Sequence, residues 1–420
     1  MGQLQVINFL NEISQQFPNA ISFAAGRPNP SFFNHDRYFS YYERFVCHYS
    51  EKRGFTKELA EQELLQYGPS QGVISEIINE YLKKDESISS ASAKFNIVTN
   101  GCQEALAIIC IHELKSEKDC MLTIDPSYPG FSGVVESLNR KLVAIDSARL
   151  YVNINDATCE FNWDYLEEIV RDTRAAGLNP KALYINPDFN NPLSYTISIN
   201  SRIKLLQLCN TLDIRIIEDS VYSKFSYMDK CLPSIKSFDE SGIVYHVGTF
   251  SKVLCPGLRL GYLVPCSGDV DSVGHLISIK SLISNNTSAF MQAVVGGFLI
   301  ENGFSVSARM SMLCKRYSHQ KDSILQALEH YLSNINGVSW HVPNGGFFCI
   351  LTVPFDFTDA SVLDCAKNYG VICAPVSKFS LYPHKWIRKI RLAFSYYDAE
   401  QIHEGVQRLS KYIRSQKSEF

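Results

Sequence analysis

The sequence predicts an α/β fold built on a mostly parallel sheet. From about Tyr67 to Leu263, short β-branched runs alternate with segments of helical periodicity, which is the pattern of a parallel sheet covered by helices on both faces. A length of 420 residues is more than one ordinary core needs and favours two domains. With 45% apolar and 20% charged residues, the chain has the composition of a protein that folds throughout.

Seven strands are expected in the first two thirds of the chain. They cover residues 95–99, 120–124, 142–145, 182–185, 214–217, 243–247 and 260–264. Apolar residues recur at helical spacing between them and predict helices over residues 103–114, 165–174 and 200–211.

The last hundred-odd residues predict a second unit of the α+β kind. A long helix from about Phe304 to Leu332 precedes strands near residues 338–341 and 347–353, and a final helix begins at Asp398.

The first sixty residues show no strand series of their own and carry turn signals at Gly26 and Pro28. We therefore expect them to pack on the C-terminal unit. The predicted domains are a large domain of residues 61–305 and a small domain formed by residues 1–60 and 306–420.

Charge and cysteine content exclude several classes of protein. Forty Lys and Arg against forty-three Asp and Glu leave a net charge of −3, so no general attraction to nucleic acid or to an anionic membrane is expected. Thirteen cysteines without a C-x-x-C pair argue against a disulfide framework and a zinc ribbon, and we expect no metal. No apolar run approaches the roughly 20 residues of a membrane helix, and the start lacks the features of a signal peptide. The sequence predicts a cytoplasmic protein.

A lysine stands just beyond one of the predicted buried strands. Gly248-Thr249-Phe250-Ser251-Lys252 follows the strand 243–247, and Arg259 opens the next strand. Taken alone, such a lysine is more often a solvated surface residue. Here the hydroxyls of Thr249 and Ser251 and the guanidinium of Arg259 can together hold a phosphate close to the lysine amine.

Other polar residues follow neighbouring strands. Asp219 follows the strand 214–217, at the end of the strand where open α/β sheets bind ligands, although an acid there can also cap a turn. Asn191 lies in a proline-containing turn, as in many plain loops. Gly101 precedes a helix whose unpaired N–H groups suit an anion, but it can also be a simple turn glycine.

Taken in order, these motifs resemble those of the fold-type I pyridoxal-phosphate (PLP) enzymes, most closely the class I/II aminotransferases of the aminoadipate and kynurenine type. The resemblance runs from Ile21-Ser22-Phe23-Ala24-Ala25-Gly26 through Tyr67-Gly68-Pro69-Ser70-Gln71-Gly72 to Ile390-Arg391-Leu392-Ala393-Phe394-Ser395, almost the whole chain. It implies the PLP-dependent transferase fold of type I. This fold has a large domain with a mostly parallel, seven-stranded sheet flanked by helices, and a smaller α+β domain.

The resemblance also implies roles for single residues. Lys252 would form an imine with pyridoxal 5'-phosphate and later act as the general base, while Asp219 would pair with the pyridine nitrogen. Asn191 and Tyr222 would bond the phenolic oxygen of the cofactor, and Tyr128 would stack on its ring. The phosphate would lie against Gly101, Cys102, Gln103, Thr249, Ser251 and Arg259.

Four more residues concern the substrate and the assembly. Arg391 would grip the substrate α-carboxylate and, with Asn191, set the orientation of the substrate. An isolated arginine on a strand more often pairs with a surface acid. Tyr67 would reach the phosphate of the neighbouring subunit, which implies a homodimer with shared active sites. Gly26 and Arg27 lie in a segment that lines the substrate pocket. Arg27 either neutralises an acidic substrate side chain or forms an ordinary surface salt bridge.

One turn departs from the family pattern. Asn190-Asn191-Pro192-Leu193-Ser194 replaces the usual Gln-Asn-Pro-Thr-Gly, so the turn loses its glycine and keeps the asparagine that faces the cofactor. We expect a slight shift in the geometry of this turn.

The sequence therefore predicts a PLP-dependent aminotransferase that moves an amino group between an α-amino acid and a 2-oxo acid. Another PLP enzyme on the same scaffold, such as a β- or γ-eliminase, a cyclase or an oxidase of a specialised amino acid, remains an alternative. A third alternative is an effector-binding module like that of the MocR-type regulators. Those regulators carry a basic winged helix ahead of the cofactor domain, which here begins within the first twenty-odd residues.

Overall fold

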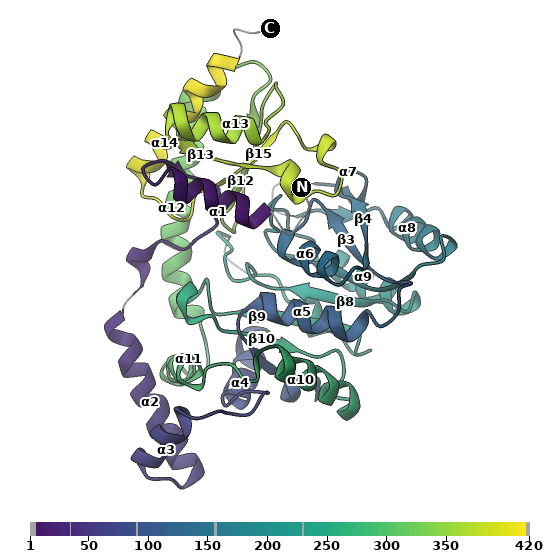
Figure 1. The fold of residues 1–420 in the computed structure, drawn as a ribbon, viewed down its shortest axis with the longest axis vertical. Helices are drawn as coiled ribbons and strands as arrows, with labels where there is room; N and C mark the ends of the chain where they lie inside the picture. Colours follow the sequence, from purple (N-terminus) through teal and green to yellow (C-terminus); the bar gives the residue numbers. More distant parts are fainter. Residues whose placement is uncertain (1–5, 34, 90, 155–157, 229–230, 417–420) are drawn as a thin grey trace.

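The computed structural model describes residues 6–33, 35–89, 91–154, 158–228 and 231–416. Its main sheet has seven strands in the order β2-β10-β9-β8-β7-β3-β4 (Figure 1). They are β2 (Ile97–Thr99), β3 (Asp119–Asp125), β4 (Lys141–Asp146), β7 (Asn179–Ile185), β8 (Arg215–Asp219), β9 (Val244–Thr249) and β10 (Gly261–Val264). Strand β10 is antiparallel to β2 and β9, and the other neighbouring pairs of this sheet are parallel. Each predicted strand overlaps one of these, so the predicted α/β fold is confirmed.

Helices cover both faces of this sheet because successive side chains of a strand point to opposite sides. In β7, Leu183 and Ile185 pack with α8 (Trp163–Ala175) and α9 (Ile199–Thr211). Ala182 and Tyr184 pack on the other face, with α5 (Cys102–Glu113), α6 (Pro129–Ser137) and α10 (Val270–Ser284). Strands β2, β3, β7, β8 and β9 run in the same direction. Their carboxyl ends therefore meet at one edge of the sheet.

The C-terminal unit is built on a four-stranded antiparallel sheet in the order β11-β12-β15-β14. Its strands are β11 (Ser339–Trp340), β12 (Phe348–Thr352), β14 (Ala374–Pro375) and β15 (Lys389–Ala393). The long helix α12 (Ser307–Leu332) and the last helix α14 (Ala399–Ser415) share one apolar core with it. In Figure 1 this unit, with α13 (Asp359–Asp364), forms the top of the molecule. The predicted α+β unit is confirmed.

The N-terminal sixty residues do not all pack where the sequence predicted. Helix α1 (Val6–Gln16) and β1 (Ile21–Ser22) do join the C-terminal unit, because β1 pairs with β13 (Val371–Ile372) and Ile13 and Phe23 enter its core. Helices α2 (His35–Arg53) and α3 (Lys57–Leu64) instead extend away from α13 and α14 (Figure 1).

Helix α2 packs along α11 (Ala289–Glu301), which follows the main sheet in the chain. A Cβ atom at Gly297 would lie 1.8 Å from the backbone oxygen of Tyr41, so a glycine is needed for the two helices to approach so closely. The expectation that residues 35–60 pack on the C-terminal unit is therefore wrong. The domain boundaries at residues 60 and 305 remain a proposal.

The described ranges hold two further α-helices and two further strands. They are α4 (Ser75–Asp85), α7 (Ser147–Leu150), β5 (Tyr151–Val152) and β6 (Glu160–Phe161), of which β5 and β6 form a separate antiparallel pair. None of the helices in the described ranges is long and apolar enough to span a lipid bilayer.

Candidate active site

A cavity of about 180 Å³ lies at the carboxyl edge of the main sheet. It brings together side chains that follow five different strands, because the carboxyl ends of these strands meet there. The predicted site residues that line it are Gly101, Cys102, Gln103, Tyr128, Asn191, Asp219, Tyr222, Thr249, Ser251, Lys252 and Arg259.

The start of α5 forms one end of this cavity. Gly101 precedes the helix with a φ of 86°, and no side chain caps the first N–H groups of α5, which are therefore free to bind an anion. The guanidinium of Arg259 donates to the backbone oxygen of Asn100 at 3.3 Å. The hydroxyl of Ser251 is buried and has no partner among the described residues. Together these groups make a set of hydrogen-bond donors suited to a phosphate.

Lys252 projects into the cavity from the segment after β9. Its amine donates to the backbone oxygen of Gly26 at 2.8 Å. Burial, together with the nearby guanidinium groups of Arg259, Arg27 and Arg391, lowers the pKa of this amine to about 8. An amine with such a pKa is much more readily deprotonated near neutral pH than an ordinary lysine.

Asp219 ends β8 on the same cavity and is only 4% exposed. Burial raises the pKa of its carboxyl to about 6. Its Oδ2 accepts a hydrogen bond from the hydroxyl of Tyr184 at 2.6 Å, whereas Oδ1 has no hydrogen-bond partner among the described residues. A buried carboxylate oxygen without a partner is costly, so this atom is suited to accept a hydrogen bond from a ligand.

Two of the predicted residues that line the cavity are tyrosines. The hydroxyl of Tyr128 donates to Oε1 of Gln103 at 3.0 Å, which fixes its ring. The ring of Tyr222 packs edge-on against Phe347 and Phe348. Burial raises the pKa of both hydroxyls, that of Tyr128 to about 12, so both remain hydrogen-bond donors at neutral pH.

Arg391 reaches the same region from β15 of the C-terminal unit. Its guanidinium lies 4.3 Å from the ring centre of Phe348 and 4.4 Å from that of Phe379. It donates to the side-chain oxygen of Asn191 and to the backbone oxygen of Ala24. Its Nε is buried without a partner among the described residues, and burial lowers its pKa to about 10. The group is a buried cation with a free donor.

The remaining predicted residues lie outside the cavity. The backbone of Gly26 faces Lys252, and a Cβ atom there would lie 2.6 Å from the ring of Phe348, so glycine is required for this approach. The side chain of Arg27 is exposed, yet close enough to lower the pKa of Lys252. Tyr67 is 84% exposed and does not line the cavity.

The unusual turn after β7 connects the two sheets. Ser194 adopts a left-handed conformation with a φ of 60°, and its hydroxyl donates to the backbone oxygen of Phe348 at 2.8 Å. Leu193 is buried. The turn keeps Asn191 on the cavity without the glycine of the family pattern.

Sequence reasoning missed four residues that line the cavity, namely Tyr184, Asn186, Val221 and Pro256. The signal for Tyr184 and Asn186 was present, because both are polar residues at the end of an otherwise apolar strand. No comparable signal marks Val221 or Pro256.

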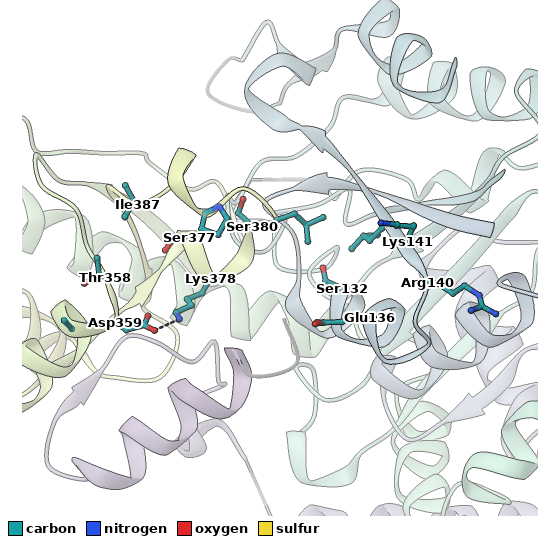
Figure 2. A pocket seen from close by; sticks show the side chains of 14 residues that line it. Ser132, Glu136, Arg140, Lys141, Thr358, Asp359, Ser377, Lys378, Ser380 and Ile387 are labelled. Atoms are coloured by element: carbon teal, nitrogen blue, oxygen red, sulfur yellow. Dashed lines mark hydrogen bonds and ion pairs between the residues drawn. The ribbon is translucent and has the colours of Figure 1, made fainter. Parts of the chain in front are cut away.

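A larger cleft of about 790 Å³ lies elsewhere, between α6 and the C-terminal unit (Figure 2). Glu136 and Ser132 line one side of it, and Lys378, which donates to Asp359 at 2.6 Å, lines the other. None of the predicted site residues borders this cleft. Its size alone does not make it a reaction site.

The smaller cavity fits the predicted cofactor. A phosphate finds its donors at the start of α5 and in Ser251 and Arg259. The unpartnered oxygen of Asp219 is suited to accept a hydrogen bond from a protonated ring nitrogen. The amine of Lys252 is suited to react with an aldehyde.

Comparison with known proteins agrees with this geometry. The chain matches the family described as aminotransferase class I and II over residues 48–409. It is 32% identical over 411 residues to the (S)-3,5-dihydroxyphenylglycine transaminase of Amycolatopsis orientalis, and the alignment covers 97% of this chain and 91% of that relative.

Two solved structures resemble the whole chain. The multiple substrate aminotransferase of Thermococcus profundus has a TM-score of 0.83 and 27% identity, and the match covers 99% of this chain and 96% of that one. The kynurenine aminotransferase of Pyrococcus horikoshii, solved with PMP and KYN as substrates, has a TM-score of 0.80 and 27% identity, with 98% and 94% covered.

Proposed function

Because the chain belongs to the class I and II aminotransferases, we propose that Lys252, Asp219 and Arg391 are the residues that carry its amino-transfer reaction. The protein is a PLP-dependent enzyme acting on an amino acid and a 2-oxo acid. The comparisons do not favour the alternatives of elimination, cyclisation, oxidation or a regulatory module. When bound, pyridoxal 5'-phosphate supplies a conjugated ring that accepts electrons from the substrate α-carbon.

The observation that carries this assignment is the meeting of Lys252 and Asp219 in one cavity. Lys252 would hold the cofactor covalently between turnovers. Once the amine of the substrate has taken its place on the cofactor, the released Lys252 amine would be free to remove the proton from the substrate α-carbon. Its lowered pKa favours the neutral amine that this step needs. Asp219, whose Oδ1 has no partner among the described residues, would keep a proton on the ring nitrogen of the cofactor.

Arg391 would orient the substrate. A free donor on a buried guanidinium is suited to bind the substrate α-carboxylate. Arg391 contacts Asn191, which lines the cavity together with Tyr222. This contact links the carboxylate subsite to the two residues that would bind the phenolic oxygen of the cofactor. The α-hydrogen is thereby held in a fixed direction relative to Lys252.

The first experiment locates the cofactor link. Borohydride treatment of the holoenzyme, followed by digestion and peptide mass mapping, should place the label on Lys252. In parallel, single amino acids should convert the absorption of the bound cofactor to that of its amine form, and a 2-oxo acid should reverse the change. A label on another lysine, or ammonia release without an amino acceptor, would contradict the proposal.

For the substrate class, we propose that amino acids with aromatic side chains are among the donors. The relative from Amycolatopsis is named for a hydroxylated phenylglycine, and a second relative, from Thermococcus litoralis, is an aromatic-amino-acid aminotransferase. The aromatic rings of Phe348 and Phe379 lie beside Arg391 and suit such a side chain. A donor screen with aromatic, acidic and basic amino acids tests this, and a preference for acidic donors would favour a role of Arg27 in side-chain recognition instead.

We further propose a cytoplasmic homodimer in which Tyr67 of one subunit reaches the phosphate bound in the other. The exposure of Tyr67 within a single chain supports this. Mixing inactive Lys252→Ala subunits with Tyr67→Ala subunits should create one native site per hybrid dimer and restore activity. Activity that only averages the two variants would rule out shared sites, and cell fractionation tests the location.

A further inference from the structure

The two oxygens of the Asp219 carboxylate have different environments. Oδ2 accepts a hydrogen bond of 2.6 Å from the hydroxyl of Tyr184, and both residues are almost fully buried, with 3% of Tyr184 and 4% of Asp219 exposed. Oδ1 has no hydrogen-bond partner among the described residues. The phenol therefore occupies one oxygen and leaves the other available to a ligand in the cavity.

Packing fixes the Tyr184 hydroxyl in this direction. The ring of Tyr184 stacks on that of Phe131, with 4.1 Å between ring centres and an angle of 10° between planes. Phe131 is itself fully buried in α6. On the other side, the side-chain amide of Asn186 donates to the backbone oxygen of Asp219. Both the backbone and the carboxylate of Asp219 are thus anchored by residues of β7 and the turn that follows it.

The contact acts on the charge of Asp219. Burial favours the neutral acid, whereas a hydrogen bond from Tyr184 favours the carboxylate and lowers its pKa. The backbone N–H of Val221 and the side chain of His246 from β9 act in the same direction as Tyr184, and Glu218 opposes them. The pKa of Tyr184 lies well above its ordinary value because of burial, so its hydroxyl stays a donor. Among the side chains that face Asp219, Tyr184 is the one whose hydrogen bond opposes burial most strongly.

We propose that Tyr184 is a positioning residue for amino transfer, which keeps Asp219 ionised and turns its free oxygen toward the ring nitrogen of the cofactor. This inference rests on the proposed function, in which Asp219 faces that nitrogen. If Asp219 were neutral, the ring nitrogen of the cofactor would no longer stay fully protonated. The ring would then accept electrons from the substrate less readily.

The chain contains a matched pair that serves as a control. Tyr245 donates to Oε1 of Glu113, also at 2.6 Å and also buried, but it does not line the cavity. Tyr245→Phe therefore removes the same kind of bond from a buried carboxylate away from the reaction. Tyr184→Phe removes one oxygen atom and keeps the stack on Phe131.

The test uses holoenzyme loaded with cofactor that carries ¹⁵N in its ring. In Tyr184→Phe, the ring-nitrogen resonance should move toward the value of an unprotonated pyridine, and kcat should fall about tenfold to a hundredfold, because a hydrogen bond to a charged group is lost. KM for the amino donor should stay within about twofold, since Arg391 is untouched. Tyr245→Phe should leave the resonance and both constants at wild-type values.

A second readout uses the protein without cofactor. With ¹³C-labelled aspartate, the Asp219 carboxyl resonance is the one that disappears in Asp219→Asn. It should titrate at higher pH in Tyr184→Phe than in wild type. Fluorotyrosine at position 184 is a stronger hydrogen-bond donor and should move this titration to lower pH, which gives a second variant if Tyr184→Phe folds poorly.

The outcomes distinguish the role of Tyr184 from the role of Asp219 in the proposed function. If Asp219→Asn shifts the ring-nitrogen resonance and Tyr184→Phe does not, the role of Tyr184 is wrong and the proposed function stands. If Asp219→Asn leaves the resonance unchanged, Asp219 does not face the ring nitrogen, and the proposed function fails at that residue. Equal effects of Tyr184→Phe and Tyr245→Phe would show a merely structural role and overturn the inference.

Discussion

The guanidinium of Arg391 donates a hydrogen bond to the side-chain oxygen of Asn191, although 200 positions separate these residues in the chain. The bond joins β15 of the C-terminal unit to the turn after β7 of the main sheet. Among the described residues, no carboxylate forms an ion pair with Arg391, and burial alone lowers its pKa. A buried cation held in this way is prepared for an anion that comes with the substrate.

Replacing Arg391 by Gln should therefore weaken binding of the amino donor. Loss of two charge-assisted hydrogen bonds of about 1.5 kcal/mol each amounts to about 3 kcal/mol, or roughly a hundredfold increase in KM. Initial rates over a range of donor concentrations measure this. Arg388→Gln is the control, because Arg388 lies just before the same strand, and its ion pair with Asp356 is more than half exposed. Equal KM values for the two variants would contradict the assignment.

The strand ends that form the site were predictable from the sequence. Asp219 and Lys252 each follow an apolar run, and parallel strands present their carboxyl ends at one edge, so the two side chains had to converge. The link between Tyr184 and Asp219 was not predictable in this way. It depends on the register that sets Tyr184 beside Ile217 and Ile185 beside Glu218, and a strand pattern does not contain its own register.

The same limit explains why residues 35–60 do not pack where the sequence predicted. The sequence of the first sixty residues shows no strand series of its own and does not indicate which surface residues 35–60 contact. These residues pack on α11, where the lack of a side chain at Gly297 leaves room for the backbone of Tyr41. A close contact between two distant segments depends on the shapes of both surfaces, and the spacing of apolar residues along the chain does not show those shapes.

Gly297→Ala tests this fit directly. Its new methyl group would lie 1.8 Å from the Tyr41 backbone oxygen, so α2 must move, and we expect a loss of about 3 kcal/mol in the free energy of unfolding. Gly274→Ala in α10 is the control, because no atom beyond the neighbouring residues and backbone of its own helix lies within 4 Å of the new methyl group. Helix propensity predicts that it stabilises the protein by about 0.5–1 kcal/mol. Urea titrations compare the two, and the same sign for both would refute the close contact between α2 and α11.

The Ser194 turn gives a second stability prediction. A left-handed conformation costs a non-glycine residue about 1 kcal/mol, and the hydrogen bond to Phe348 offsets that cost. Ser194→Gly removes both the strain and the bond, so the free energy of unfolding should change by less than about 0.5 kcal/mol. Ser194→Ala keeps the strain and loses the bond, and should destabilise the protein by about 1–2 kcal/mol. Urea titration measures both, and an alanine variant as stable as the wild type would show that the bond to Phe348 contributes nothing.

The lowered pKa of Lys252 predicts how the protein without cofactor responds to pH. Its amine should react with an acylating reagent at half the maximal rate near pH 8, the value to which burial and three arginines lower its pKa, and peptide mass mapping follows this single site. Arg27→Gln removes one of the positive charges, so the midpoint should rise. Arg171→Gln, which changes an exposed arginine on α8, should not move it.

Stability should change over the same pH range. In the unfolded chain Lys252 keeps its proton up to its ordinary pKa of 10.5, whereas in the folded chain it loses the proton near pH 8. The unfolded state therefore binds more protons between these two values, and raising the pH through this window favours the folded state. The free energy of unfolding of the wild-type protein without cofactor should increase from pH 8 to pH 10 relative to that of Lys252→Met, which lacks the titrating group. A constant difference between the two proteins over this range would mean that Lys252 titrates in the folded chain as it does in water, and the amine would then not be poised to take a proton from the substrate at neutral pH.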